Sequence, residues 1–534
     1  MSRESSGRGL RGPSRSTEYS VVVLDFGGQY AHLIARRVRE LNYRSLLVDY
    51  DSPLEDVLSL KPVAVILSGG PSSIYEEGSP WPRREVLEWL LSGSVAVLGI
   101  CYGHQLLARA LGGKVERREK AEYGISRLRV VSEDPLFKGT PGEQDVWMSH
   151  RDAVVELPPD AVRIAETDYS FIAAFRHRSK PIYGVQFHPE VRHTAYGLAI
   201  LRNFLSEVAG AKPNWFVENL VEEKIREIRE KVKGNVLIAV SGGVDSTTTA
   251  VLLLKALGPD PVHVVYVNTG LLREGEPERV LETLSRLGFR HVHYVDASRR
   301  FLERLRGVTD PEEKRRIIAE TFAEVFSEKI REIEERYGPF RFLAQGTIYP
   351  DRVESGRTGK ATAKIKSHHN VVMGEVPGVE LVEPLADFYK DEVRRIALLL
   401  GVPEDIVYQH PFPGPGLAVR VVGEVTEEKL RILRRATSIV EEEFKKSGLY
   451  REVWQAFPVL LPVKTVGVKG DSRSYEYAVA LRVVYSEDAM TASFAKLPWD
   501  FLERLAERLV NEVEGVNRVL YDITHKPPAT IEYE

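Results

Sequence analysis

Cys101 is the only cysteine of the 534-residue chain, and it stands in the segment Gly99-Ile100-Cys101-Tyr102-Gly103. An apolar run of strand length precedes this segment and a helical pattern follows it, so the thiol is expected on a sharp strand-to-helix turn. A helix N-terminus beside a thiol favours the thiolate, which is the nucleophilic form. A buried structural cysteine is the usual alternative, but the elbow pattern favours a catalytic one.

A thiol nucleophile needs a base, and the base needs a group that orients it. The downstream segment Gly184-Val185-Gln186-Phe187-His188-Pro189-Glu190 supplies both candidates. His188 and Glu190 are two residues apart, so they are expected to share one side of an extended segment. The segment Ser68-Gly69-Gly70-Pro71 ends an earlier strand and could direct backbone N–H groups at an oxyanion. The pattern therefore predicts a Cys/His/Glu triad.

A second polar segment, Ser241-Gly242-Gly243-Val244-Asp245-Ser246, lies between the apolar run 236–240 and a helical pattern at 247–257. Adjacent glycines allow a tight turn and a close approach to a ligand. The two serines and the free N–H groups of a helix start form an anion cradle. An ordinary strand-to-helix turn is the alternative. The loop has no lysine at the P-loop position, and it resembles the pyrophosphate-binding loop of the ATP pyrophosphatases.

The composition indicates a globular protein, with 43% hydrophobic and 28% charged residues. The formal net charge of −4 argues against a general nucleic-acid footprint. Residues 1–16 are rich in Ser, Gly and Arg and are expected to form a flexible tail without a signal peptide. No apolar run reaches about 18 residues, which argues against a membrane span. A single cysteine cannot form an internal disulfide. A cytoplasmic location is expected.

Alternating strand and helix patterns predict two doubly wound α/β domains followed by a smaller α+β domain. We expect the domains at residues 17–208, 211–412 and 413–534, with a hinge at 411–416 where prolines and glycines alternate. The third block is expected to contain strands at 419–422, 459–468 and 478–484 and helices at 427–446 and 499–513.

The first block resembles the class I glutamine amidotransferases in the motifs LSGGPSS, GICYGHQ, MSH and GVQFHPEV, which come in that family's order. The resemblance implies that Cys101 attacks the glutamine amide, that His188 moves protons and that Glu190 orients His188. It further assigns the oxyanion and glutamine contacts to Gly70, Tyr102, Gln105, Ser149 and His150. Arg151 departs from the family, which commonly has glycine after Ser-His.

The second block resembles the glutamine-hydrolysing GMP synthase family in SGGVDS, NTGLLREGE, LAQGTIYPDRVES, KIKSHHN, LVEPLADFYKDEVR and HPFPGPGL. The resemblance implies ATP and XMP as substrates and Lys390 near pyrophosphate. Mg²⁺ is expected to neutralise the polyphosphate charge, with Asp245 as its candidate ligand. It also implies a lid whose working residues are Asp351, Glu354, Lys366, His368 and His369. Asn268 and Val372-Met373 depart from the family pattern.

The third block ends in KPPATIEYE, with TVGVKGDSRSYEY before it, and both segments resemble the dimerisation and XMP-binding domain of the same family. The resemblance implies a homodimer through this domain. The XMP contacts would come from Arg315, Arg420, Gln455, Lys526 and Glu532. Lys and Arg suit a phosphate, and a carboxylate suits the N–H groups of a base.

Two alternatives share these motifs in part. One is another glutamine-dependent adenylating enzyme, such as an NAD or asparagine synthetase, against which the KPPATIEYE ending speaks. The other is a tRNA-thiolating protein with the same pyrophosphate loop. Such sulfur relays often use additional cysteines, whereas Cys101 is already assigned to the elbow. The motifs therefore favour a ligase with two reaction sites.

Overall fold

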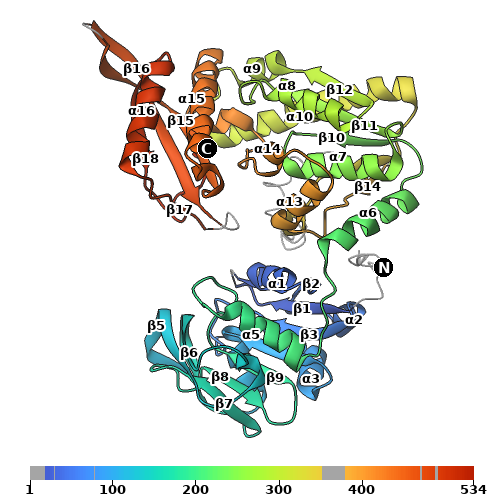
Figure 1. Ribbon diagram of the computed structural model, residues 1–534, viewed down its shortest axis with the longest axis vertical. Coiled ribbons are helices and arrows are strands. Elements are labelled where there is room, and N and C mark those ends of the chain that lie inside the picture. Colours follow the sequence, from blue (N-terminus) through green and yellow to red (C-terminus); the bar gives the residue numbers. More distant parts are fainter. Residues whose placement is uncertain (1–18, 29, 77, 352–378, 470–471, 487–490) are drawn as a thin grey trace, which may run out of the picture. The chain divides into compact units, whose positions relative to one another are not determined.

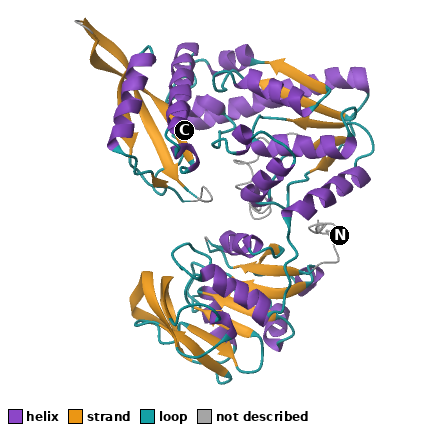
Figure 2. Ribbon diagram, in the orientation of Figure 1, coloured by secondary structure: helices purple, strands orange, loops and turns teal. Residues whose placement is uncertain are grey.

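The structure is a computed structural model that describes residues 19–28, 30–76, 78–351, 379–469, 472–486 and 491–534. The chain forms two compact units, Met1–Phe216 and Val217–Glu534. Both units combine sheets with covering helices (Figure 2). Within the described ranges, no helix is long and apolar enough to cross a bilayer.

The first unit is built on a nine-stranded sheet in the order β2-β1-β3-β4-β9-β8-β7-β5-β6 (Figure 1). The five strands from β2 to β9 are parallel, and every later neighbour in the order is antiparallel. The strands are β1 Ser20–Asp25, β2 Ser45–Asp49, β3 Pro62–Leu67, β4 Ala96–Ile100, β5 Lys114–Val130, β6 Glu143–Glu156, β7 Ala161–Glu166, β8 Ala174–His177 and β9 Ile182–Val185.

Strands β1, β4 and β9 are fully buried runs because helices cover the sheet, as is usual for parallel sheets. Val22, Val65 and Val97 lie on three neighbouring strands and form part of the unit's hydrophobic core. The helices are α1 Ala31–Glu40, α2 Leu54–Ser59, α3 Arg84–Ser92, α4 Tyr102–Ala110 and α5 Gly197–Asn203, with a 3₁₀ turn at Pro135–Phe137 and a π turn at Phe204–Val208. Helix α4 follows β4 directly, which places Cys101 between them.

The second unit begins with a five-stranded parallel sheet in the order β12-β11-β10-β13-β14. The strands are β10 Val236–Ala239, β11 Val262–Asn268, β12 His291–Asp296, β13 Phe342–Ala344 and β14 Glu380–Val382. The helices are α6 Val217–Lys231, α7 Val244–Leu257, α8 Glu276–Leu287, α9 Ser298–Leu305, α10 Pro311–Tyr337, α13 Lys390–Leu399 and α14 Glu404–Val407. Helix α7 follows β10 and carries half of the predicted anion cradle.

Side chains alternate across this sheet, so each face has its own helices. Helices α6, α7 and α13 pack on one another, and Figure 1 shows them on one side of the sheet. Val265 and Val267 of β11 instead belong to a core cluster with Phe301 of α9 and Phe326 of α10. The doubly wound arrangement predicted for this block is confirmed.

The chain ends in a smaller α+β part. Strands β15 Gln455–Lys469 and β16 Ser472–Tyr485 form a long antiparallel pair, β17 Ser493–Phe494 pairs with β16, and β18 Val516–Asp522 runs parallel to β16. Helices α15 Glu427–Lys446 and α16 Trp499–Glu512 pack against these strands, and a short 3₁₀ turn lies at Leu449–Arg451.

One expected element of this part is wrong. Residues 419–422 were expected as a strand because three of the four are β-branched or apolar. Val419 and Arg420 instead end a 3₁₀ helix at Gly416–Arg420, and the strand is reduced to an isolated bridge between Val421 and Leu460. Gly416 explains the difference, because its φ of +64° turns the chain against the Leu271 carbonyl, where a Cβ would lie only 2.3 Å from the oxygen.

The parallel sheet and the C-terminal part share one hydrophobic core. The same cluster contains Leu237 of β10, Phe326 of α10, Leu433 of α15, Leu481 of β16 and Leu505 of α16. The segment 411–416, predicted as a hinge, therefore lies inside the second compact unit. The predicted boundary at this segment stays a prediction.

Candidate functional site

Cys101 lies on a strained turn that only its glycine neighbours allow. Its φ of 51° and ψ of −102° are unusual for a residue with a side chain. A Cβ on Gly99 would lie 2.4 Å from the Gly103 carbonyl oxygen, and one on Gly103 would lie 2.5 Å from that of Leu67. The Cys101 N–H donates to the Val185 carbonyl at 2.9 Å. The predicted elbow is therefore formed, with the thiol at the start of α4.

His188 and Glu190 form a buried pair beside this thiol. The distance from His188 Nδ1 to Glu190 Oε1 is 2.7 Å, and both side chains are almost fully buried. The segment turns after β9 instead of staying extended, so the two side chains meet through a turn and not through the expected alternation. Burial lowers the pKa of His188, but the carboxylate of Glu190 and the side chain of Cys101 outweigh burial and raise it from 6.5 to about 10. The imidazolium form is therefore favoured.

The triad opens onto a cleft of about 470 Å³. Its lining includes the predicted residues Gly70, Tyr102, Gln105, Ser149 and His150, together with Cys101 and His188. A Cβ on Gly69 would lie 3.2 Å from the His188 ring, so the Gly-Gly segment approaches the triad as closely as glycine permits. The structure thus brings the triad and the predicted oxyanion and glutamine-binding residues together.

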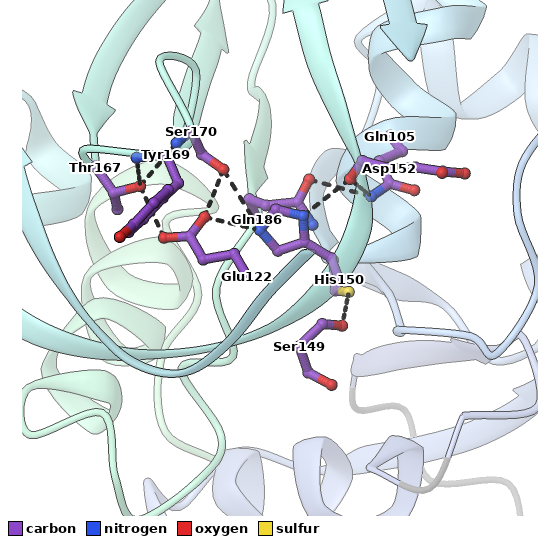
Figure 3. A network of polar contacts seen from close by, with 10 residues as sticks. Gln105, Glu122, Ser149, His150, Asp152, Thr167, Tyr169, Ser170 and Gln186 are labelled. Carbon is purple, nitrogen blue, oxygen red and sulfur yellow. Dashed lines mark hydrogen bonds and ion pairs between the residues drawn. The ribbon is translucent and has the colours of Figure 1, made fainter. Parts of the chain in front are cut away.

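The wall of the cleft carries a polar network that sequence reasoning missed (Figure 3). The Gln105 amide donates to the Asp152 carbonyl at 2.7 Å and to Gln186 Oε1 at 3.2 Å. Glu122 Oε2 lies 3.1 Å from His150 Nε2. Glu122, Asp152 and Gln186 are all buried. Gln186 lies in the motif GVQFHPEV, but no role was predicted for it. No motif identified Glu122 or Asp152, because polar residues on strands are normally expected to face solvent.

The second predicted site is the anion cradle between β10 and α7. The Ser241 N–H donates to Ser246 Oγ at 3.1 Å, and the Gly243 N–H donates to Ser241 Oγ at 3.4 Å. Gly242 has a φ of +83°, which favours glycine. Helix α7 begins at Val244, three residues earlier than expected, so the N-terminal N–H groups of the helix belong to this loop.

Gly346 supports the cradle from the end of β13. A Cβ at this position would lie 2.9 Å from the Ser246 nitrogen and 3.0 Å from the Asp245 carbonyl carbon. Since both atoms belong to the backbone, they cannot move aside cheaply. Gly346 is part of the motif LAQGTIYPDRVES, but its packing role could not be read from the sequence.

Lys390, the first residue of α13, reaches the cradle. Its Nζ lies 2.5 Å from Asp245 Oδ2, while Asp245 Oδ1 is buried and has no hydrogen-bond partner within the described part of the chain. A free carboxylate oxygen beside an anion site could serve as one ligand of Mg²⁺. In nucleotide sites this ion is usually held by one or two carboxylates together with substrate phosphates and several waters. No group of three or more metal-ligating side chains occurs among the residues that the structure describes.

Of the predicted lid residues, the structure describes Asp351 alone. Its carboxylate accepts a hydrogen bond from the Ile348 N–H at 3.1 Å, just beyond β13. Glu354, Lys366, His368 and His369 lie outside the described residues, as does the Val372-Met373 departure. Asn268 ends β11, and its side chain accepts from the Gly270 N–H at 2.9 Å.

The predicted XMP residues are brought together in part. Arg420 Nε and Nη2 contact the two carboxylate oxygens of Glu532 at 3.0 and 2.8 Å, and Gln455 Nε2 donates to Glu532 Oε1 at 2.8 Å. Arg315 of α10 donates to the main-chain carbonyl of Glu534. Lys526 forms a β-bridge with Ala492.

Two buried basic residues that the sequence did not reveal hold the C-terminal segment. Lys314 is fully buried, pairs with the Glu534 carboxylate and donates to the Val421 carbonyl at 2.8 Å. Arg482 of β16 is also fully buried and donates to the Thr530 carbonyl at 2.9 Å. The segment that carries Glu532 is therefore packed into the unit and not frayed.

The fold and the cleft agree with two family models. The model "Glutamine amidotransferase class-I" matches residues 22–208, and the model "GMP synthase C terminal domain" matches residues 442–533. The first unit therefore contains a class I glutamine amidotransferase domain.

Relatives at about half identity cover nearly the whole chain. GMP synthase (glutamine-hydrolyzing) of Aquifex aeolicus is 53% identical over 518 residues, which are 96% of this chain and 99% of the relative. The enzyme of the same name from Thermomicrobium roseum is 52% identical and covers 98% of both chains, and that of Pyrobaculum aerophilum is 52% identical over 96% and 99%. The chain belongs to the glutamine-hydrolysing GMP synthase family. This membership decides against an NAD or asparagine synthetase and against a tRNA-thiolating protein.

Proposed function

We propose that the chain makes GMP from XMP by two coupled reactions, one in each compact unit. The observation that carries the proposal is the presence of two sites: a thiol elbow with a buried His–Glu pair in the first unit, and an anion cradle whose loop 241–246 contains no lysine in the second. The first arrangement suits the hydrolysis of an amide, and the second suits the release of pyrophosphate.

In the first reaction, the Cys101 sulfur attacks the side-chain amide carbon of glutamine. His188, held by Glu190 at 2.7 Å, donates a proton to the leaving nitrogen, and ammonia departs. Water then cleaves the thioester and yields glutamate. The N–H groups of Gly70 and Tyr102 stabilise the developing oxyanion. Gln105, Ser149 and His150 form the wall that holds the substrate.

In the second reaction, the C2 oxygen of XMP attacks the α-phosphorus of ATP, and pyrophosphate leaves into the cradle at 241–246. A carbonyl oxygen is a poor leaving group, whereas AMP is a good one, which is why adenylation precedes amination. Lys390 and the helix N-terminus hold the pyrophosphate charge. Bound Mg²⁺, with Asp245 as a ligand, would neutralise polyphosphate charge.

Ammonia from the first reaction then attacks C2 of the adenylated XMP and displaces AMP. The substrate contacts would come from Arg315, Arg420, Gln455, Lys526 and Glu532, and the adenylation lid from Asp351, Glu354, Lys366, His368 and His369. Since Glu532 is already hydrogen-bonded to Arg420 and Gln455, it approaches XMP as one member of a preformed cluster. Such a cluster lowers the ordering cost of binding.

A homodimer through the C-terminal part belongs to the same proposal. Its support is an exposed apolar surface on the β15–β16 pair, where Val463, Val466, Val468 and Tyr475 are each at least half exposed. Exposed apolar patches of this kind mark interaction surfaces. A cytoplasmic location follows because ATP and XMP are intracellular nucleotides. Size-exclusion chromatography with light scattering tests the dimer.

The direct test is to incubate the enzyme with XMP, ATP, Mg²⁺ and glutamine and to separate the nucleotides. GMP, AMP and glutamate are expected in equal amounts. A parallel reaction with an ammonium salt in place of glutamine measures the reaction of the second unit alone. Absence of GMP from both reactions would refute the proposed activity.

A further inference from the structure

Glu122 is a buried carboxylate behind the wall of the glutamine cleft. It lies on β5 directly opposite His150 of β6, just after an irregularity in the pairing between Arg117 and Glu122. Its side chain is 4% exposed, whereas the next residue, Tyr123, is 69% exposed and lines the cleft. A buried carboxylate is unfavourable unless hydrogen bonds satisfy it, so its place in the strand pair needs an explanation.

The hydrogen bonds of Glu122 are complete. Oε1 accepts from Thr167 Oγ1 at 2.9 Å, and Oε2 accepts from Ser170 Oγ at 2.7 Å and lies 3.1 Å from His150 Nε2. Burial raises the pKa of Glu122, but the contacts with His150 and Ser170 outweigh burial and lower it. The carboxylate is thus ionised and acts only as an acceptor.

Both ring nitrogens of His150 face acceptors. Nε2 faces the Glu122 carboxylate, and Nδ1 lies 2.9 Å from the main-chain carbonyl of Asp152. A carbonyl and an ionised carboxylate cannot donate. Both contacts are therefore hydrogen bonds only when each ring nitrogen carries a proton. Burial lowers the pKa of the neighbouring His104 of α4 to about 3, and the ionisable side chains of Arg117, Arg151 and Asp152 line the same cleft as His150.

The held ring fixes a short segment of β6 that contacts the nucleophile. The Cys101 thiol donates to the Ser149 carbonyl with a sulfur-to-oxygen distance of 3.6 Å. The Asp152 carbonyl accepts from both His150 and Gln105, and its carboxylate accepts from Ser73. Figure 3 shows this continuity from Ser170 through Glu122 and His150 to the cleft residues.

We propose that Glu122 is a positioning residue for glutamine hydrolysis. It holds the His150 ring in the form in which both ring nitrogens carry a proton, and it thereby fixes the Ser149 carbonyl against Cys101. The inference rests on the proposed glutaminase role of Cys101. Glu122 does not line the cleft, so it acts through His150 and not on the substrate.

Two variants separate the charge of Glu122 from its hydrogen bonds. In Glu122→Gln the amide can donate to His150 Nε2, which then needs no proton. In Glu122→Ala the ring loses the carboxylate at Nε2, while Nδ1 keeps the Asp152 carbonyl. Loss of a charge-assisted hydrogen bond corresponds to roughly ten- to hundredfold in rate or binding. We expect Glu122→Ala to lower glutamine-driven kcat by that factor and Glu122→Gln to lower it by less, with ammonium-driven GMP synthesis unchanged.

The matched control is Glu116→Gln, an exposed carboxylate on the same strand that pairs with Lys114 at 2.7 Å. It should leave both reactions unchanged. Nitrogen NMR of histidine-labelled protein, with the His150 signals assigned from His150→Gln, adds a direct readout. Two protonated ring nitrogens are expected in the parent enzyme and one in Glu122→Gln.

Three results would overturn the proposal: glutamine kinetics of Glu122→Gln and Glu122→Ala equal to the control, an equal loss with ammonium, or unchanged His150 ring signals in Glu122→Gln. If Glu122→Ala does not fold, Glu122→Gln alone decides. Failure of the glutaminase role itself would appear separately, as glutamine-driven synthesis that survives in Cys101→Ala.

Discussion

The guanidinium of Arg420 and the carboxylate of Glu532 form a two-point ion pair, at 2.8 and 3.0 Å, across 112 residues of sequence. Arg420 also lies over the rings of Phe412 and Phe457, at 5.1 and 4.0 Å from their centroids. The guanidinium is 2% exposed. Because this charge is buried, the stability of the fold around it depends on the carboxylate of Glu532.

We expect Glu532→Ala to destabilise the second unit and to raise the KM for XMP. The buried guanidinium would lose its partner, which typically costs about 3–5 kcal/mol of folding free energy for a fully buried pair and less here because Glu532 is partly exposed. The KM for XMP should rise roughly ten- to hundredfold, while that for ATP moves much less. Steady-state kinetics and thermal unfolding test this, with the exposed Glu514→Ala as the control. An unchanged KM for XMP would contradict the XMP assignment.

Cys101→Ala should abolish GMP synthesis from glutamine and leave synthesis from ammonium salts intact. The substitution removes the sulfur but keeps the elbow, because alanine also carries a Cβ and adds no bulk. Synthesis is measured with each nitrogen source at saturating XMP and ATP. Equal loss with both sources would mean that the thiol supports the structure and not the hydrolysis.

The glutaminase should lose activity at alkaline pH in a manner that depends on Glu190. The pKa of His188 is raised from 6.5 to about 10. The free energy that protonated His188 contributes to folding is therefore fully present below pH 6.5 and is lost as the pH rises through about 10. Glu190→Gln removes the negative charge that stabilises the His188 imidazolium. The pKa of His188 then falls, and the alkaline limb of kcat/KM for glutamine moves to lower pH. A limb that stays in place would show that another group controls it.

ATP should be cleaved between its α and β phosphates. The cradle at 241–246 lacks the lysine of a P-loop, and its serines and helix N-terminus suit a leaving pyrophosphate. Label placed on the γ-phosphate should appear in pyrophosphate, together with unlabelled AMP. Labelled orthophosphate accompanied by ADP would refute the assignment of the loop.

Gly346→Ala should raise the KM for ATP by displacing the cradle. The added Cβ would lie 2.9 Å from the Ser246 nitrogen, which belongs to the backbone of α7. Overpacking of this kind typically costs about 1–3 kcal/mol. Gly142→Ala is the matched control, since a Cβ there meets nothing within 4 Å. Glutaminase activity should be unchanged in both variants, and an unchanged KM for ATP in Gly346→Ala would contradict a tight contact.

Elements with strong local signals were predicted closely from the sequence. Helix α15 spans Glu427–Lys446 as expected, because Thr426 caps its start and apolar residues recur along one face. The elbow and the cradle were predicted for the same reason, since glycine and small polar residues at fixed spacing determine a local backbone shape. The predicted strand at 419–422 was wrong because the preceding Gly416 has a positive φ and packs against the Leu271 carbonyl, which is a tertiary contact.

Residues that act through distant partners could not be predicted. Glu122 and Arg482 lie on long strands with many charged residues, and nothing local distinguishes an inward-facing charge from an outward-facing one. Their roles depend on strand register, which pairs Glu122 with His150 and places Arg482 beside the segment 524–531. Register is decided by the whole sheet.

The hydrophobic core that contains both Leu237 and Leu505 has a consequence for how this protein can be divided. The parallel sheet and the C-terminal strands bury the same apolar surface, so neither can be removed without exposing the other to water. We therefore expect the second unit to unfold as one cooperative unit, even though its sequence consists of two blocks with different motifs. An exchange of the C-terminal part between relatives would have to bring matching side chains of α9 and α10 with it.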